Sequence, residues 1–180
     1  SHRIKCLCLR WQPSVKENYI AEDVASGFYK VIKHLLSNGH RDIAFISNME
    51  DERRMPGIRK AMAEFNCEVN EDIAVNIQRG FRNEAYEATG KLLARKKRFT
   101  AVVCHNDAAA LGVMERLMIA GLRIPEDVSV TGFDNIRESS VYPVPLTSCG
   151  ASVDRIVTES IKFLFRSSSD ENLFEMLIEP

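Results

Sequence analysis

Short runs of β-branched and aliphatic residues alternate along this chain with longer stretches in which apolar residues recur at helical spacing. The runs at 43–47, 101–104 and 128–131 are typical of buried strands, and helical spacing fills 23–37 and 107–120. Consecutive parallel strands are joined by right-handed crossovers, and the connecting helices then cover the sheet. The pattern therefore predicts an α/β fold with parallel sheets flanked by helices.

The remaining segments follow the same alternation. We expect strands at 4–9, 73–77 and 174–178, and helices from Pro56 onward, over 83–95 and over 153–165. Gly39 suits the end of the first helix, because glycine readily adopts the left-handed conformation found there. Ligand sites in such folds lie outside the carboxyl ends of the strands. Polar residues that directly follow strands are therefore the candidates for function.

Composition narrows the class of function. A net charge of −1 leaves no dense basic face of the kind that nucleic acids require, and the run 95–98 is better explained as a solvated helix end than as a DNA patch. No apolar run approaches the roughly 20 residues that span a bilayer, and no signal segment opens the chain. Five scattered cysteines favour reduced thiols over disulfides. We therefore expect a cytoplasmic protein without a membrane partner.

Polar residues follow three predicted strands, at 47–54, 105–107 and 132–135. Asp107 directly precedes a helical pattern, so we expect it to be the N-cap of that helix. For Asn106 and Asp134, a turn role and a ligand contact remain equally open. The histidines lack metal-ligand spacing, and no nucleophile, base and oxyanion arrangement is evident. We therefore expect no metal, no cofactor and no catalytic residue.

Five ordered motifs carry a family resemblance. They are GHR-x-IA-x-I at 39–46, R-x-x-G-x-x-x-A at 54–61, TAV…ND-x-x-A-x-G at 100–112, GL-x-IP-x-DVSV-x-GFDN at 121–135, and Pro145-Leu146-Thr147. Together they resemble the effector-binding domain of the lactose/galactose repressor (LacI/GalR) family. The resemblance implies a periplasmic-binding-protein-like fold of type I, with two lobes and a small-molecule effector in the cleft between them.

The resemblance also implies an organisation in three segments. Residues 1–40 would be a strand and a helix of the first lobe, residues 41–137 the second lobe, and residues 138–180 a return to the first lobe with a helix and the final strand. The sequence begins at what resembles the last strand of the first lobe. We therefore expect one nearly complete lobe and an incomplete partner.

Effector-binding residues are implied residue by residue. On the second lobe, Arg54 resembles the cleft arginine of the family, Asn106 and Asp134 its polar pair, and Phe81 its stacking aromatic residue. Asp23 resembles the effector-contacting acid of the first lobe. Carboxylate, guanidinium and amide groups around an aromatic face suit a polar, ring-shaped ligand such as a sugar or a nucleoside.

Two assignments remain open. Arg53 competes with Arg54 for the arginine role, although the spacing to Gly57 favours Arg54. Trp11 follows a predicted strand and is either a second stacking residue or an ordinary half-buried tryptophan.

The resemblance implies the effector-binding and dimerisation region of a transcriptional regulator. Homodimers would form through surfaces near 112–121 and 137–143, and operator DNA would bind only through a domain absent from this chain. The same sensor fused to a kinase, a cyclase or another DNA-binding domain is an alternative. A periplasmic sugar receptor is a second alternative, but the free cysteines and the missing export signal disfavour it. An enzyme is the least favoured.

Overall fold

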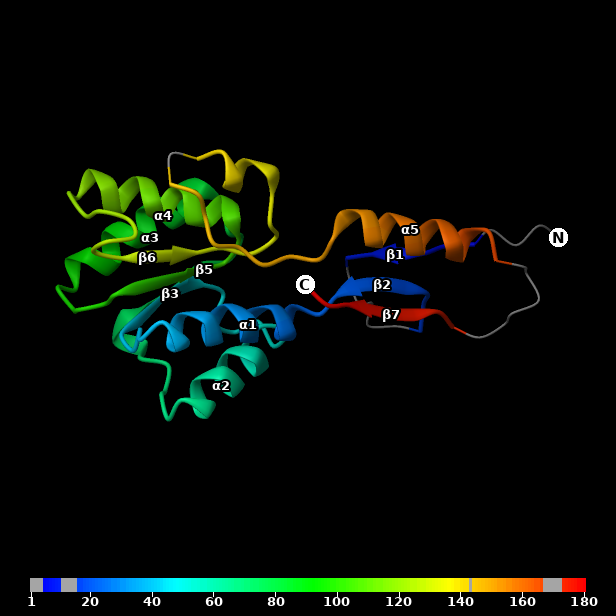
Figure 1. Ribbon diagram of the computed structural model, residues 1–180, viewed down its shortest axis with the longest axis horizontal. Helices are drawn as coiled ribbons and strands as arrows, with labels where there is room; N and C mark the ends of the chain where they lie inside the picture. The colour runs from blue at the N-terminus through cyan, green and yellow to red at the C-terminus, as the bar shows by residue number, and fades with distance from the viewer. Residues whose placement is uncertain (1–4, 11–15, 143, 167–172) are drawn as a thin grey trace. The chain divides into compact units, whose positions relative to one another are not determined.

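A computed structural model describes residues 5–10, 16–142, 144–166 and 173–180 of the chain (Figure 1). These residues form two compact units, which are described separately below. The larger unit is Ala25–Cys149, and the smaller unit combines the chain up to Val24 with the chain from Gly150 onward. Within the described ranges, no helix is both long enough and apolar enough to cross a membrane.

The larger unit is built on a parallel sheet. Its described strands are β3 (Ile43–Ser47), β4 (Ala74–Asn76), β5 (Ala101–Cys104) and β6 (Ser129–Thr131). They are hydrogen-bonded in the order β4-β3-β5-β6, and Thr131 forms a further parallel bridge with Thr147. Every residue of β3 and β5 is buried, as expected for central strands covered on both faces.

Helices cover both faces of this sheet. They are α1 (Val24–Ser37), α2 (Met55–Glu64), α3 (Arg82–Ala94) and α4 (Asp107–Ile119), with short 3-10 helices at Glu71–Ile73 and Arg137–Ser140. Figure 1 shows α3 and α4 on one side and α1 and α2 on the other. Ile46 of β3 and Val102 of β5 join the core formed with α3 and α4. Because side chains alternate along a strand, Phe45 and Val103 face the opposite layer.

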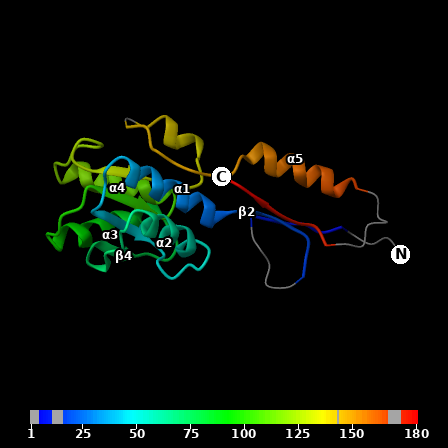
Figure 2. The same ribbon diagram turned by 60° about the horizontal axis from the view of Figure 1, so that its bottom comes forward.

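The smaller unit has a thinner core. Its described strands are β1 (Cys8–Leu9), β2 (Tyr19–Glu22) and β7 (Glu175–Ile178), which pair in parallel in the order β1-β2-β7. Helix α5 (Val153–Leu164) lies along this sheet in both views (Figures 1 and 2). Ile20, Ile156 and Ile178 are the buried residues of its core cluster.

The predicted fold class is confirmed, and the bounds of β3 and β5 match the prediction. The strand expected at 73–77 is shorter, because Asn70 accepts a hydrogen bond from the Asp72 amide and begins a 3-10 turn there. The strand expected at 4–9 is observed only at Cys8–Leu9 among the described residues. Strand β2 was not predicted, because its burial depends on pairing with β1 and β7, which come from opposite ends of the chain.

The division between the units differs from the boundaries expected at residues 40 and 137. It falls after Val24 and after Cys149, so that nearly all of α1 belongs to the larger unit. The physical reason is that α1 packs there: the ring of Phe28 stacks on that of Phe133 with centroids 4.9 Å apart. Val31, Ile32 and other residues on the same face of α1 are also buried.

The contact between α3 and α4 yields a first prediction. A Cβ at Gly112 would lie 2.1 Å from the carbonyl oxygen of Arg82, so the two backbones meet directly. We expect Gly112→Ala to lower the free energy of unfolding by about 1–3 kcal/mol, because the helices must separate. Urea unfolding of the purified chain measures this change.

Gly90 on α3 provides the matched control. A Cβ there would come no closer than 3.4 Å to the movable Arg116 side chain. Because alanine is the better helix former, Gly90→Ala should leave the free energy of unfolding unchanged or raise it by up to about 1 kcal/mol. Equal losses in the two variants would contradict a direct backbone contact at Gly112.

Candidate functional site

The carboxyl ends of β3, β5 and β6 bring several of the predicted side chains together in the larger unit. Arg54 ends the loop that follows β3, His105 and Asn106 follow β5, and Asp134 follows β6. In a parallel sheet these ends share one edge, which is where ligands bind in open α/β folds. The contacts described next link Arg54 directly to His105.

Arg54 lies at the centre of this cluster and is only 9% exposed. Its Nε donates to Oδ2 of Asp51 at 2.9 Å, and its Nη1 donates to the carbonyl oxygen of His105 at 2.6 Å. The guanidinium carbon lies 5.1 Å from the centroid of the Phe28 ring. A buried charge is costly unless it is paired and hydrogen-bonded, and Arg54 has both a carboxylate and a carbonyl partner. Its orientation is therefore fixed.

Arg53 has a different environment from Arg54. Its side chain is 50% exposed and binds the same carboxylate, with Nη2 2.8 Å from Oδ2 of Asp51. Burial acts to raise the pKa of Asp51, but the hydrogen bonds from Arg53 and Arg54 outweigh it and hold this pKa well below its ordinary value. Asp51 is therefore ionised at neutral pH. Arg54 is thus the more deeply buried of the two arginines.

His105 contacts the guanidinium through its ring as well as its backbone. Its Nε2 lies 3.1 Å from Nη2 of Arg54, and its Nδ1 lies 3.3 Å from the backbone nitrogen of Asn48. Burial and the positive charge of Arg54 lower the pKa of His105 to about 4, so the ring is neutral at pH 7. A neutral imidazole has one acceptor nitrogen, so Arg54 and Asn48 compete for it.

Asn106, and not Asp107, caps helix α4. The Oδ1 atom of Asn106 accepts a hydrogen bond from the Ala109 amide at 2.8 Å, and the Asn106 backbone is extended, as N-cap residues usually are. The expectation for Asp107 was wrong by one residue, because Asp107 is already the first helical position. Asp107 is instead fully buried and accepts from the Ile136 amide at 2.8 Å and from the Ser148 hydroxyl at 2.5 Å.

Phe81 stands at the start of α3 and is 55% exposed. The preceding loop is anchored by Glu84, whose carboxylate accepts backbone hydrogen bonds from Gln78 at 2.8 Å and from Gly80 at 3.1 Å. Gly80 has a φ of +67°, and a Cβ there would lie 2.4 Å from the His105 ring. An ordered loop that approaches the His105 ring at Gly80 therefore leads into Phe81, whose side chain is largely accessible.

Asp134 lies in a loop with a left-handed backbone. Its φ is 99° and that of Asn135 is 50°, and the Asp134 amide donates to the carbonyl of Cys149 at 2.8 Å. Burial lowers the pKa of Arg54, and the negative charges of Asp51 and Asp134 act against that shift. The negative charge of Asp134 therefore favours the charged form of Arg54.

Two predicted residues are not among the described residues of the larger unit. Asp23 belongs to the smaller unit, where it follows β2 and its amide donates to the carbonyl of Ile178 at 2.9 Å. Trp11 lies outside the described residues. Their proposed contacts with an effector therefore remain predictions.

Asp51, His105 and Phe28 contribute to the cluster but were not among the predicted site residues. Asp51 and His105 lie within the polar strand ends identified from the sequence, so their position after β3 and β5 was the available signal. Phe28 has the spacing of an ordinary core residue on α1. Its contact with Arg54 depends on how α1 packs, which local sequence does not specify.

The cluster offers hydrogen bonds, charge and an aromatic face to a ligand. Across the described parts of the chain, no group of three or more His, Cys, Asp or Glu side chains is placed to hold a metal ion. Parallel sheets flanked by helices, with polar groups at the carboxyl edge, define an α/β domain of the periplasmic-binding-protein type.

Comparison with known proteins agrees with this class. Residues 32–176 match the family described as "Periplasmic binding protein-like domain". The chain belongs to this family, and within it to the branch of effector-binding domains represented by the LacI/GalR regulators.

Curated relatives include proteins named "HTH-type transcriptional repressor PurR". The one from Histophilus somni (strain 129Pt) is 36% identical over 176 residues, which cover 94% of this chain and 52% of the relative. That from Vibrio campbellii is also 36% identical, covering 92% of this chain and 52% of the relative. The chain thus spans about half the length of the curated relatives that it matches.

Solved structures of LacI-family regulators are also similar. A regulator from Enterococcus faecium with bound ribose has a TM-score of 0.83 at 25% identity, covering 96% of this chain and 66% of that chain. A sugar-binding regulator from Escherichia coli complexed with phosphate has a TM-score of 0.81 at 25% identity, covering 95% of this chain and 63% of that chain.

The neutral state of His105 predicts a pH dependence of stability. Its ordinary pKa is 6.5 and its folded pKa is about 4, so the unfolded chain binds more protons between these values. The free energy of unfolding should therefore fall by about 1–3 kcal/mol as pH falls from about 6.5 to about 4, and His105 adds no further change below that window. Urea titrations across this range measure the fall.

A His105→Gln variant isolates the contribution of this residue. The pKa of His40 is also lowered, by burial and by the charge of His34, so part of the slope belongs to that ring. We expect the free energy of unfolding of His105→Gln to depend less steeply on pH than that of the unmodified chain. His40→Gln should remove a separate part of the same slope. Identical slopes for His105→Gln and the unmodified chain would contradict a buried neutral His105.

Proposed function

We propose that this chain is the effector-sensing region of a LacI/GalR-type transcriptional regulator, with operator DNA bound by a domain outside these residues. The observation that carries the proposal is the buried Arg54 guanidinium, which Asp51 and His105 hold at the carboxyl edge of the larger sheet. The relatives named as helix-turn-helix repressors support it, because the chain matches about half of their length.

The proposed effector is a sugar or a related small metabolite such as a nucleoside. Arg54 would donate to its oxygens, Asn106 and Asp134 would bind its hydroxyl groups, and Phe81 would cover one face of its ring. Asp23 would accept from a hydroxyl on the side of the smaller unit. The ribose bound to the Enterococcus faecium regulator and the sugar-binding name of the Escherichia coli regulator support this class of ligand.

The proposed activity is binding without chemistry. An effector that binds one arrangement of the protein more tightly shifts the population toward it, by no more than its difference in affinity for the two states. The relatives are named as repressors, which supports a regulatory role over an enzymatic one. Because repressors act on DNA, these names also support a cytoplasmic location. The alternatives are the same sensor joined to another output domain, and a periplasmic sugar receptor.

A ligand screen tests this proposal. Thermal-shift measurements with ribose, nucleosides and phosphorylated sugars should identify a ligand that raises the melting temperature. Because Phe81 is more than half exposed, we expect Phe81→Ala to fold normally and to weaken that ligand about tenfold, or about 1.4 kcal/mol.

The matched control is Leu9→Ala, which removes another half-exposed apolar side chain, in the smaller unit. It should leave the affinity unchanged. The assignment of Phe81 to the effector site would be abandoned if Phe81→Ala bound the ligand as tightly as the unmodified chain does. If no member of the panel shifted the melting temperature, the proposed ligand class would lack support.

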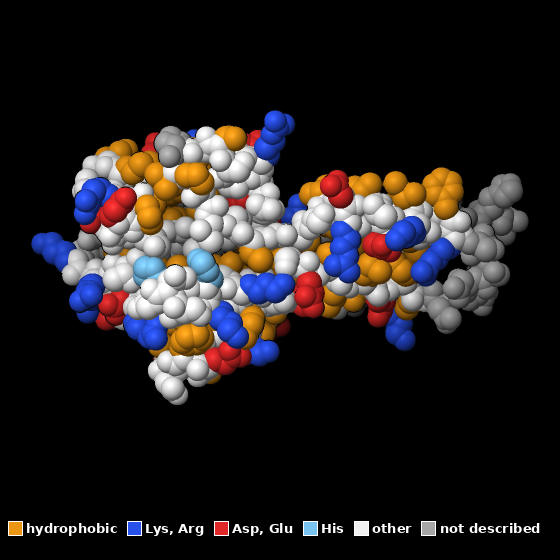
Figure 3. All heavy atoms as spheres, viewed as in Figure 1, with side chains coloured by type: hydrophobic (Ala, Val, Ile, Leu, Met, Phe, Trp, Pro, Cys, Tyr) orange, Lys and Arg blue, Asp and Glu red, His pale blue; other side chains and the backbone are white. Residues whose placement is uncertain are grey.

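We further propose that the chain forms a homodimer through the larger unit. Met118 and Ile119 at the end of α4 and Val141 after the second 3-10 helix are exposed apolar residues. Figure 3 shows hydrophobic side chains gathered on this unit over α4. Arg82 and Glu115, whose side chains are 2.8 Å apart, lie on the adjoining helices α3 and α4. Apolar residues with a charged rim are typical of subunit interfaces.

Placing a charge within this surface tests the dimer. Ile119→Glu should weaken dimerisation about tenfold or more, because a buried unpaired carboxylate is costly at an interface. Analytical ultracentrifugation at high micromolar concentration measures the effect. Val157→Glu on α5 makes the same change at another exposed apolar residue, and it should leave the dimer intact. A larger loss with Val157→Glu would place the interface on the smaller unit.

A further inference from the structure

A hollow lies on the surface of the larger unit, beside the edge strand β4. Its volume is about 680 Å³, and it is formed by α2, β4 and the loops next to them. Small-molecule sites in proteins typically have volumes of roughly 300–1,000 Å³. The lining residues include neither Arg54 nor any other proposed effector residue. It is therefore distinct from the cluster at the strand ends.

Three methionines contribute to the apolar part of this lining, and Met49 is the most exposed of them. Met49 comes from the loop after β3, and Met55 and Met62 lie about two turns apart on α2. Thioether sulfur is polarizable and makes favourable contacts with aromatic rings, and unbranched methionine side chains adjust to the shape of a ligand. The lining therefore suits an aromatic group.

The polar part of the lining is mainly acidic. Glu50, Glu68 and Glu71 contribute three carboxylates, and Arg59 contributes one guanidinium. Within the described residues, no hydrogen bond or ion pair is observed for the side chains of these three glutamates. Glu64, on the same helix, accepts a hydrogen bond from Tyr29 and pairs with Lys33 at 3.4 Å. The hollow thus has an excess of unpaired negative charge that a cationic ligand would complement.

A sheet edge can also accept a peptide strand, but β4 has little capacity left for one. The residues of β4 that face away from β3 are Ala74 and Asn76, because Val75 and Ile77 point their backbone groups toward β3. The Ala74 amide already donates to Glu71, and the Ala74 carbonyl accepts from Arg95 at 2.9 Å. Only the backbone of Asn76 remains for a further strand. A small molecule therefore suits this hollow better than a peptide.

We propose that this hollow binds a small aromatic amine, whose ring contacts the three methionines and whose ammonium group lies among Glu50, Glu68 and Glu71. The site adjoins the Arg54 cluster through the chain, because Met55 directly follows Arg54. The amide of Met49 also donates to Oδ1 of Asn76 at 3.1 Å, which ties the loop after β3 to the edge strand. A ligand here contacts both ends of the loop that carries Asp51.

Cys67 makes the site accessible to experiment, because it lines the hollow and is partly exposed. We expect 2-phenylethylamine to slow the alkylation of Cys67 by iodoacetamide, while Cys6 in the smaller unit reacts at an unchanged rate. Exposed ion pairs contribute little, so we expect weak binding. With a Kd of about 5 mM, about 10 mM amine slows Cys67 about threefold. Peptide mass mapping follows both cysteines in one sample.

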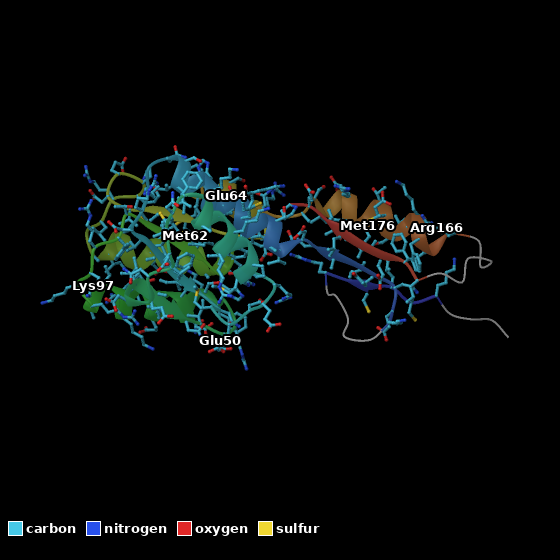
Figure 4. The ribbon with its side chains drawn as sticks, turned by 90° about the horizontal axis from the view of Figure 1, so that it is seen from below. Glu50, Met62, Glu64, Lys97, Arg166 and Met176 are labelled. Carbon is cyan, nitrogen blue, oxygen red and sulfur yellow. The ribbon has the colours of Figure 1, made fainter. Side chains whose placement is uncertain are left out.

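Matched ligands and variants test the chemistry. The uncharged analogue 2-phenylethanol and the anion 3-phenylpropionate should protect Cys67 much less than the amine does. The double substitution Glu50→Gln and Glu71→Gln should remove the protection, while Glu64→Gln should keep it. Figure 4 labels Glu50, Met62 and Glu64 and shows the two glutamates well apart on this unit. All these glutamates are exposed, so the variants should fold normally.

Methyl NMR of the methionines provides an independent measurement. The amine should shift the signals of Met49, Met55 and Met62, and it should leave Met114 and Met176 unchanged. Shifts confined to those three methionines together with protection of Cys67 would support the site. No protection at Cys67, equal protection by the alcohol, or undiminished protection in the double variant would each overturn the proposal.

Discussion

The buried guanidinium of Arg54 is the interaction on which the arrangement of the strand ends depends. A charge taken out of water is destabilising unless other groups replace its hydration. Here the carboxylate of Asp51, the carbonyl of His105 and the ring of Phe28 replace it. These partners come from α1, from the loop after β3 and from the end of β5. One charge therefore fixes the relative positions of three segments that are distant in sequence.

The sequence was sufficient where a pattern is local. Strands β3 and β5 were predicted at their observed bounds, because each is an uninterrupted apolar run next to glycine or polar residues. Strand β2 was missed, since its burial depends on β1 and β7, which come from opposite ends of the chain. The first helix was assigned to the other unit for a related reason. Its apolar face shows that the helix packs against a sheet, but it does not show which sheet.

Within the candidate site, the sequence indicated which residues follow the strands but not how these residues contact one another. Arg54, Phe81, Asn106 and Asp134 were selected through a family resemblance. Their partners could not be, because the contacts of Arg54 with Asp51 and His105 arise only when two strand ends meet. The N-cap of α4 was predicted at Asp107 and is observed at Asn106, and this difference also depends on contacts between strand ends. Either residue can cap a helix, and the buried surroundings of Asp107 favour its bonds to Ile136 and Ser148.

Glu84 gives the Phe81 loop an unusual property. Its carboxylate binds successive backbone amides from Gln78 onward, a geometry that otherwise captures free anions, so this small nest is permanently occupied by the protein's own side chain. The loop is consequently ordered without a ligand, so the proposed stacking of an effector on Phe81 would require little loss of backbone entropy. If the proposed site is correct, such a surface would discriminate between ligands by their shape, because it would not adapt to each of them.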